Sequence, residues 1–109
     1  MPRHVKTSRR DDNELEIFAA FRACGCLVYP GGPLDAVVGL RGQWWIVEIK
    51  DGSKPPSHRR LTPAEKAFIE QAHGYPVAII ETTRAVRDLV NRSDFAIYHA
   101  SVLPWLSPR

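Results

Sequence analysis

Two apolar runs separated by only two residues constrain the fold of this chain most strongly. Residues 34–40 and 43–50 are rich in β-branched and aromatic side chains, which favour strands. Only Arg41 and Gly42 stand between the runs, and a two-residue connection of this kind predicts an antiparallel hairpin. The chain is therefore expected to contain a β-sheet that includes this hairpin.

Local start and stop signals place the other elements around the hairpin. Thr62, Pro63 and Glu65 form the pattern of a capping box, in which the first and fourth residues bond to each other's backbone amides. Asp12 or Asn13 can cap an earlier helix, and Gly25 can end it. In chain order, we expect a helix at 12–24, strands at 27–29, 34–40 and 43–50, a helix at 62–73, a strand at 77–80, a helix at 82–90 and an edge strand at 95–98. This order predicts an α/β fold, with a mixed β-sheet flanked by helices.

Length and composition indicate a single domain spanning residues 1–109. The chain is 44% hydrophobic and 25% charged, which is ordinary for a soluble globular protein. Residues 1–11 are expected to be a basic flexible segment, and residues 101–109 a C-terminal tail. No apolar run approaches the ~20 residues that cross a bilayer, and no signal peptide is recognisable, so we expect a cytoplasmic protein without a membrane partner. Cys24 and Cys26 are expected to be reduced and largely buried.

Basic side chains gather in two places. The net charge of +3 fits a polyanionic partner such as DNA without requiring one. Such clusters can contact phosphates, or they can simply be solvated loops. The candidate DNA-binding residues are Arg9, Arg10, Lys54, His58, Arg59 and Arg60.

Acidic and basic side chains also converge at one end of the expected hairpin. Alternation along residues 43–50 places Glu48 and Lys50 on the same face as Trp44, and places Trp45 on the opposite face. If Arg41 and Gly42 form the turn, residues 34–35 pair with residues 48–49. Asp35 then lies beside Glu48 and Lys50.

This combination of groups suits phosphodiester hydrolysis. Carboxylate oxygens are the ligands that Mg²⁺ and Mn²⁺ prefer, so Asp35 and Glu48 are candidate metal ligands, with the backbone carbonyl of Ile49 as a further one. Lys50 can orient the attacking water or neutralise developing charge. Taken singly, Asp35 can instead be a turn residue, and Glu48 with Lys50 an exposed ion pair of little energetic weight.

Asp35, followed after twelve residues by Glu48-Ile49-Lys50, resembles the motif of the PD-(D/E)XK nuclease superfamily. The stretches 51–56 and 61–65 resemble small phage and bacterial members related to virus-type replication-repair (VRR-NUC) nucleases and to archaeal-type Holliday junction resolvases. The resemblance covers residues 12–90 and implies a restriction-endonuclease-like core. It also implies a deoxyribonuclease that depends on Mg²⁺ or Mn²⁺. One departure is that Leu34 precedes Asp35, where the family commonly has proline.

The resemblance further implies an acidic residue on the first helix. Helical phase places Glu14 in the middle of the apolar arc that contains Ile17 and Phe18, and places Glu16 on the opposite side. Glu14 is therefore the expected catalytic and metal-site residue, with Glu16 as the second choice. Gln71 is a lower-ranked candidate, because some relatives use a glutamine on the helix after the lysine.

These observations predict a metal-dependent endonuclease that hydrolyses DNA phosphodiester bonds. Branched or flapped DNA, such as a Holliday junction, is the expected substrate. A homodimer is expected, because each copy of a small chain carries one site and a twofold dimer cuts both strands. Two alternatives stay open: a non-catalytic DNA-binding module on a nuclease-like scaffold, and a restriction- or toxin-like nuclease.

Overall fold

The computed structural model describes residues 12–92. The basic segment 1–11, the expected edge strand at 95–98 and the tail 101–109 lie outside these residues. The elements in chain order are α2 (Glu14–Ala23), β1 (Leu27–Pro30), β2 (Ala36–Leu40), β3 (Gln43–Ile49), the short 3₁₀ helix η1 (Pro56–His58), α3 (Pro63–Gln71), β4 (Val77–Ile80) and α4 (Thr83–Asn91). The expected order of helices and strands is confirmed over this range, and η1 is an addition inside the loop that follows β3.

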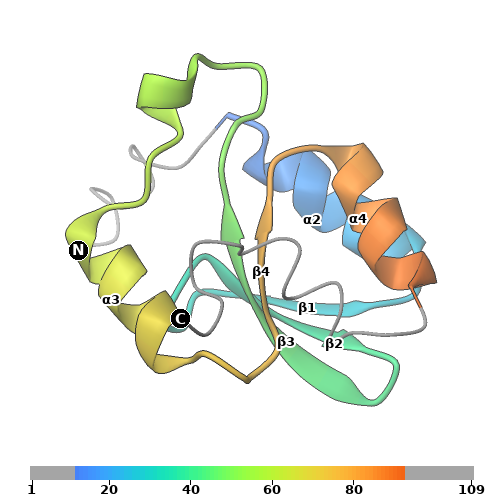
Figure 1. Ribbon diagram of the computed structural model, residues 1–109. Coiled ribbons are helices and arrows are strands. Elements are labelled where there is room, and N and C mark those ends of the chain that lie inside the picture. Colours follow the sequence, from blue (N-terminus) through green and yellow to red (C-terminus); the bar gives the residue numbers. More distant parts are fainter. Residues whose placement is uncertain (1–11, 93–109) are drawn as a thin grey trace, which may run out of the picture.

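The four strands form one mixed sheet in the order β1-β2-β3-β4 (Figure 1). β1 with β2, and β2 with β3, are antiparallel, whereas β3 and β4 are parallel. The predicted hairpin is confirmed: Arg41 and Gly42 both have positive φ, 54° and 79°, as the tightest hairpin turns require. The parallel pair needs a crossover, and residues 50–76 with α3 supply it.

Helices cover both faces of the sheet. α2 and α4 lie side by side on one face (Figure 1), where Phe21, Trp45, Val47 and Leu89 are fully buried. α3 covers the other face through Ile69, which packs with Leu34 and Val77. The alternation expected along β3 therefore holds, since Trp45 is fully buried and Trp44 is 53% exposed.

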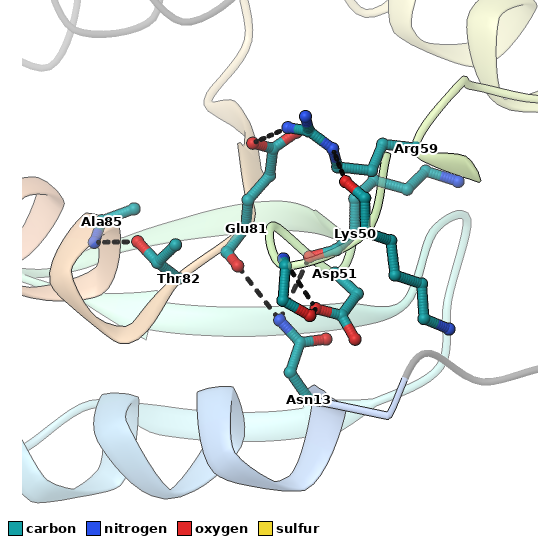
Figure 2. Close-up of polar contacts among 9 residues, drawn as sticks. Asn13, Lys50, Asp51, Arg59, Glu81, Thr82 and Ala85 are labelled. Carbon is teal, nitrogen blue, oxygen red and sulfur yellow. Dashed lines mark hydrogen bonds and ion pairs between the residues drawn. The ribbon is translucent and has the colours of Figure 1, made fainter. Parts of the chain in front are cut away.

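Each helix start is fixed by a polar contact, although not always the expected one. The capping box of α3 is present, with Glu65 N–H donating to Thr62 Oγ1 (3.1 Å) and Thr62 N–H donating to Glu65 Oε1 (2.8 Å). Thr82 caps α4 by accepting from Ala85 N–H (3.0 Å; Figure 2). Asn13 occupies the cap position of α2, but the expected side-chain cap is wrong. Its amide instead crosses to the strand ends, as described below.

Two smaller expectations are also resolved. Cys26 is buried, whereas Cys24 is exposed because it follows the last turn of α2; both are free thiols. Burial of Cys26, with Cys24 nearby, raises the pKa of its thiol. None of the helices between residues 12 and 92 has the length and apolar character needed to cross a membrane.

Candidate active site

The site lies where β3 extends beyond β2. The last residues paired between these two strands are Ala36 and Val47, yet β3 continues beside β4 as far as Ile49. Asp35 fills the gap, because its N–H donates to the Val47 carbonyl (3.0 Å) and its carboxylate accepts from Ile49 N–H (2.8 Å). Asp35 thus lies opposite residues 48–49, as the hairpin register predicted.

Glu48 and Lys50 point to the α3 side of the sheet and are nearly inaccessible to water. Glu48 is 2% exposed and Lys50 9%. The Lys50 ammonium lies 3.2 Å from Glu48 Oε2. Because both side chains are buried, this contact differs from the exposed ion pair that a strand end would ordinarily carry.

Glu65 completes the cluster, although its sequence pattern predicted only a capping role. Its Oε1 lies 3.0 Å from Lys50 Nζ and also accepts the Thr62 amide of the capping box. The capping box of α3 accounts for a glutamate at this position, so no contact with Lys50 was expected. The available signal was helical phase: Glu65 stands three and four residues before Phe68 and Ile69, which face the sheet. The same face of α3 therefore brings Glu65 over β3.

The charges of this cluster are unbalanced. Burial, with Asp35 and Glu65 nearby, outweighs the Lys50 ammonium and raises the pKa of Glu48 to about 9, so Glu48 holds a proton at neutral pH. Burial raises the pKa of Glu65 too, but the Thr62 amide, Glu48 and Lys50 outweigh it and lower the pKa overall. Burial lowers the pKa of Lys50, but its bond to Glu65 and the nearby Glu48 more than compensate, and the net shift is upward. Lys50 is thus an ammonium that faces ionised Glu65 and a neutral Glu48.

The donor set fits a divalent cation. Asp35 and Glu65 both lie close enough to Glu48 to raise its pKa, and hard cations prefer carboxylate oxygens of this kind as ligands. The Lys50 ammonium lowers the pKa of Glu48 but is outweighed by burial, Asp35 and Glu65, and a bound cation would further favour the ionised carboxylate. Within residues 12–92, however, no three His, Cys, Asp or Glu side chains are arranged to hold a metal ion. Lys50 Nζ contacts both Glu48 and Glu65, so a cation bound to Glu48 would compete with Lys50 for that carboxyl group.

The two candidates on α2 separate as helical phase predicted. Glu14 is 4% exposed and shares the buried side of α2 with Ile17, whereas Glu16 is exposed. α2 packs on the sheet face opposite the one that carries Glu48. The start of α2 nevertheless lies at the end of the sheet where the acidic cluster is. Asn13 Nδ2 donates there to the carbonyls of Lys50 and Glu81, both at 3.1 Å, and Figure 2 shows its contact with Glu81. Glu14 therefore lies near the strand ends that carry the cluster, on the other side of the sheet.

The loop after β3 braces the site and presents some of its basic residues. Arg59 contacts Glu81 at 3.1 Å, as Figure 2 shows, and its Nε donates to the Lys54 carbonyl at 2.8 Å. This pairing ties the loop to the end of β4, and contact of Arg59 with phosphates stays a prediction. His58 and Arg60 are exposed, and Lys54 lies 3.6 Å from exposed Asp12. Arg9 and Arg10 lie outside the described residues.

Gln71 is not beside Lys50. It lies at the opposite end of α3 from Glu65 and lines an apolar groove with Trp44 and Tyr75. The separation follows from helix length, because six residues of helix span about 9 Å.

Comparison of the chain with protein-family models, with curated proteins and with solved structures finds no match.

Proposed function

We propose that this chain is a divalent-metal-dependent nuclease with a restriction-endonuclease-like core that hydrolyses phosphodiester bonds in DNA. One observation carries the proposal: Glu48 is a buried carboxyl group with a pKa raised to about 9, adjacent to Asp35 and 3.2 Å from the Lys50 ammonium. Burying such a group is costly, and perturbed groups of this kind cluster at functional sites. The order of helices and strands along the chain is consistent with that core.

Each residue of the cluster has a distinct part in this proposal. Asp35 and Glu48 hold Mg²⁺ or Mn²⁺, with the Ile49 carbonyl as a further ligand. The bound ion supplies Lewis acidity toward the phosphate. Lys50 places its ammonium next to the reacting groups, where it orients the attacking water and neutralises developing negative charge. Glu65 holds Lys50 in position through the 3.0 Å contact.

Other residues extend the site toward the DNA. Glu14, buried at the same end of the sheet, is the candidate from α2 for supporting the ion. Lys54, His58 and Arg60 follow the active strand and contact the phosphate backbone, which gives affinity without sequence information. Without a cation the acidic cluster would repel the same backbone, so DNA binding close to the site depends on the metal.

Cleavage of supercoiled plasmid, a flapped duplex and a four-way junction tests the proposal, each with Mg²⁺ or Mn²⁺. Wild type is expected to cut at least one substrate and to stop when EDTA removes the metal. Lys50→Ala is expected to reduce the rate by roughly 100-fold or more while leaving DNA binding intact. Lys66→Ala is the matched control, because Lys66 is an exposed lysine on α3.

Two outcomes would contradict the proposal. If wild type binds these substrates but cuts none with either metal, the chain is a non-catalytic DNA-binding module. If Lys50→Ala cuts as fast as Lys66→Ala, the chemistry lies elsewhere on the molecule.

A further inference from the structure

An apolar groove lies on the same face of the sheet as the acidic cluster. It has a volume of about 400 Å³, and its lining includes Trp44, Ile46, Phe68, Gln71 and Tyr75. None of its lining residues carries a formal charge. Two of its aromatic rings are open to solvent, since Trp44 is 53% exposed and Tyr75 70% exposed.

The groove and the cluster are joined by two elements. One face of β3 carries Trp44, Ile46 and Glu48, which are every second residue of the strand. The Cα atoms of Trp44 and Glu48 are four residues apart and therefore lie about 13 Å from each other. α3 runs above the same path, with Glu65 at the cluster and Gln71 at the groove. A strand stacked as in a duplex covers this distance in about four nucleotides, and an extended strand covers it in fewer. A nucleic-acid strand bound at the cluster thus reaches the groove.

The Trp44 ring is held in place rather than loosely exposed. It lies over Gly39, where a Cβ atom would come within 3.1 Å of the ring. Tyr29 packs against it with ring centroids 5.9 Å apart and planes tilted by 53°. A ring fixed in this way loses little conformational entropy when a planar ligand stacks on it.

We propose that this groove binds an unpaired nucleobase of the DNA strand whose phosphate lies at the acidic cluster. This inference rests on the proposed nuclease function and specifies its substrate class as DNA with an unpaired strand, such as a flap. A base offers the flat, uncharged surface that the groove accepts, and its edge can hydrogen-bond to the Gln71 amide. A paired base has no free face for Trp44, so the groove discriminates unpaired from paired DNA.

Fluorescence anisotropy with Ca²⁺ in place of Mg²⁺ tests the proposal, because Ca²⁺ binds carboxylate oxygens and lets the strand approach the cluster, but is a weaker Lewis acid for the cleavage step. The probes are one labelled duplex with a ten-thymidine flap, the same duplex with an abasic flap of equal length, and the blunt duplex. The two flaps carry the same phosphates and differ only in their bases. Wild type is expected to bind the thymidine flap roughly tenfold more tightly than the abasic flap, as one or two stacked bases provide.

Variants locate the discrimination. Trp44→Ala and Tyr75→Ala are each expected to remove most of the tenfold preference and to leave binding of the blunt duplex unchanged. Leu15→Ala is the control, because Leu15 is 76% exposed on α2, on the other side of the sheet. Circular dichroism confirms that each variant is folded, and the two groove variants test the same groove independently.

Equal affinity of wild type for the two flaps would overturn the inference, even if the protein cuts DNA with Mn²⁺. A preference that both groove variants retain would overturn it as well. In that case, a lower melting temperature of either variant would mean that the groove residues serve the chain's own packing. Conversion of a dimer to a monomer would mean that the groove binds a second copy of the chain. A preference lost in both variants supports the inference, and it does so even if no cleavage is detected and the nuclease proposal fails.

Discussion

Glu48 is the side chain whose environment is least favourable to its own charge. Burial raises its pKa to about 9 from an ordinary value of 4.5, so the folded protein binds a proton that the unfolded chain releases at lower pH. The contribution of Glu48 to stability is therefore greatest below pH 4.5, falls as the pH rises above that value, and levels off above about 9. At neutral pH Glu48 therefore destabilises the metal-free fold, as functional groups often do.

Replacing Glu48 with glutamine is expected to stabilise the metal-free protein. Glutamine keeps the volume, can donate to Glu65 and can accept from Lys50, and it carries no charge. We expect the melting temperature in EDTA to rise by a few degrees, equivalent to about 1 kcal/mol. Mn²⁺ should raise the melting temperature of wild type but not of this variant. The measurement is thermal unfolding followed by circular dichroism.

The matched control is Glu70→Gln, since Glu70 is an exposed glutamate on α3. It should change the melting temperature little in EDTA and keep the shift with Mn²⁺. A melting temperature of Glu48→Gln below that of wild type in EDTA would contradict this prediction and show that Glu48 stabilises the metal-free fold.

At the scale of elements, the start of α3 belongs to two structures at once. Glu65 Oε1 accepts from Thr62 N–H at 2.8 Å and from Lys50 Nζ at 3.0 Å. The first contact satisfies a backbone N–H at the start of the helix. The second orients the Lys50 side chain at the end of β3. The position of α3 and the orientation of Lys50 are therefore coupled, because any shift of the first turn of α3 moves Glu65, the partner of Lys50.

Two substitutions separate these roles. Thr62→Ala removes the side-chain cap and should destabilise the protein by about 1 kcal/mol, with a small effect on cleavage. Glu65→Ala removes the cap partner and also the contact that positions Lys50. Its cleavage rate should therefore be at least tenfold lower than that of Thr62→Ala, at a similar loss of stability. Cleavage rates at 20 °C, where both variants are folded, provide the comparison. Equal rates for the two variants would mean that Glu65 acts only as a cap.

The elements also show how far the sequence predicts the structure. Arg41-Gly42 and the alternation along β3 predicted the hairpin and its register, and hence that Asp35 lies beside Glu48. The capping pattern of α3 was predicted because a cap is a local interaction. The second partner of Glu65 and the strand-end contacts of Asn13 were missed, because both depend on residues 15 to 68 positions away. Local sequence patterns do not specify contacts between residues that are this far apart along the chain.

At the scale of the whole molecule, each copy of the chain carries the acidic cluster described within residues 12–92. The principal-axis extents are 38 × 34 × 26 Å, and the net charge of +3 is small for a chain that binds a polyanion alone. We therefore expect a homodimer whose twofold axis presents two sites to opposite strands. Leu27 and Tyr29, both more than half exposed on edge strand β1, offer an apolar surface for that contact.

Sedimentation equilibrium at micromolar concentration is expected to give twice the chain mass of 12.3 kDa. Tyr29→Glu should shift the mass toward the monomer, because it buries a charge in the expected contact. Arg84→Glu, at an exposed position on α4, is the control. A monomer at concentrations that support full cleavage would refute the dimer.

The parallel pairing of β3 with β4 also dictates an order of assembly. During synthesis, the hairpin that carries Asp35, Glu48 and Lys50 leaves the ribosome well before residues 63–80. Hairpin contacts are short in sequence and close quickly, whereas a parallel pair must wait for its whole crossover. In the nascent chain Glu48 and Lys50 are therefore still in water. The burial and the contacts with Glu65 that shift their pKa values arise only when α3 arrives and β4 closes the sheet.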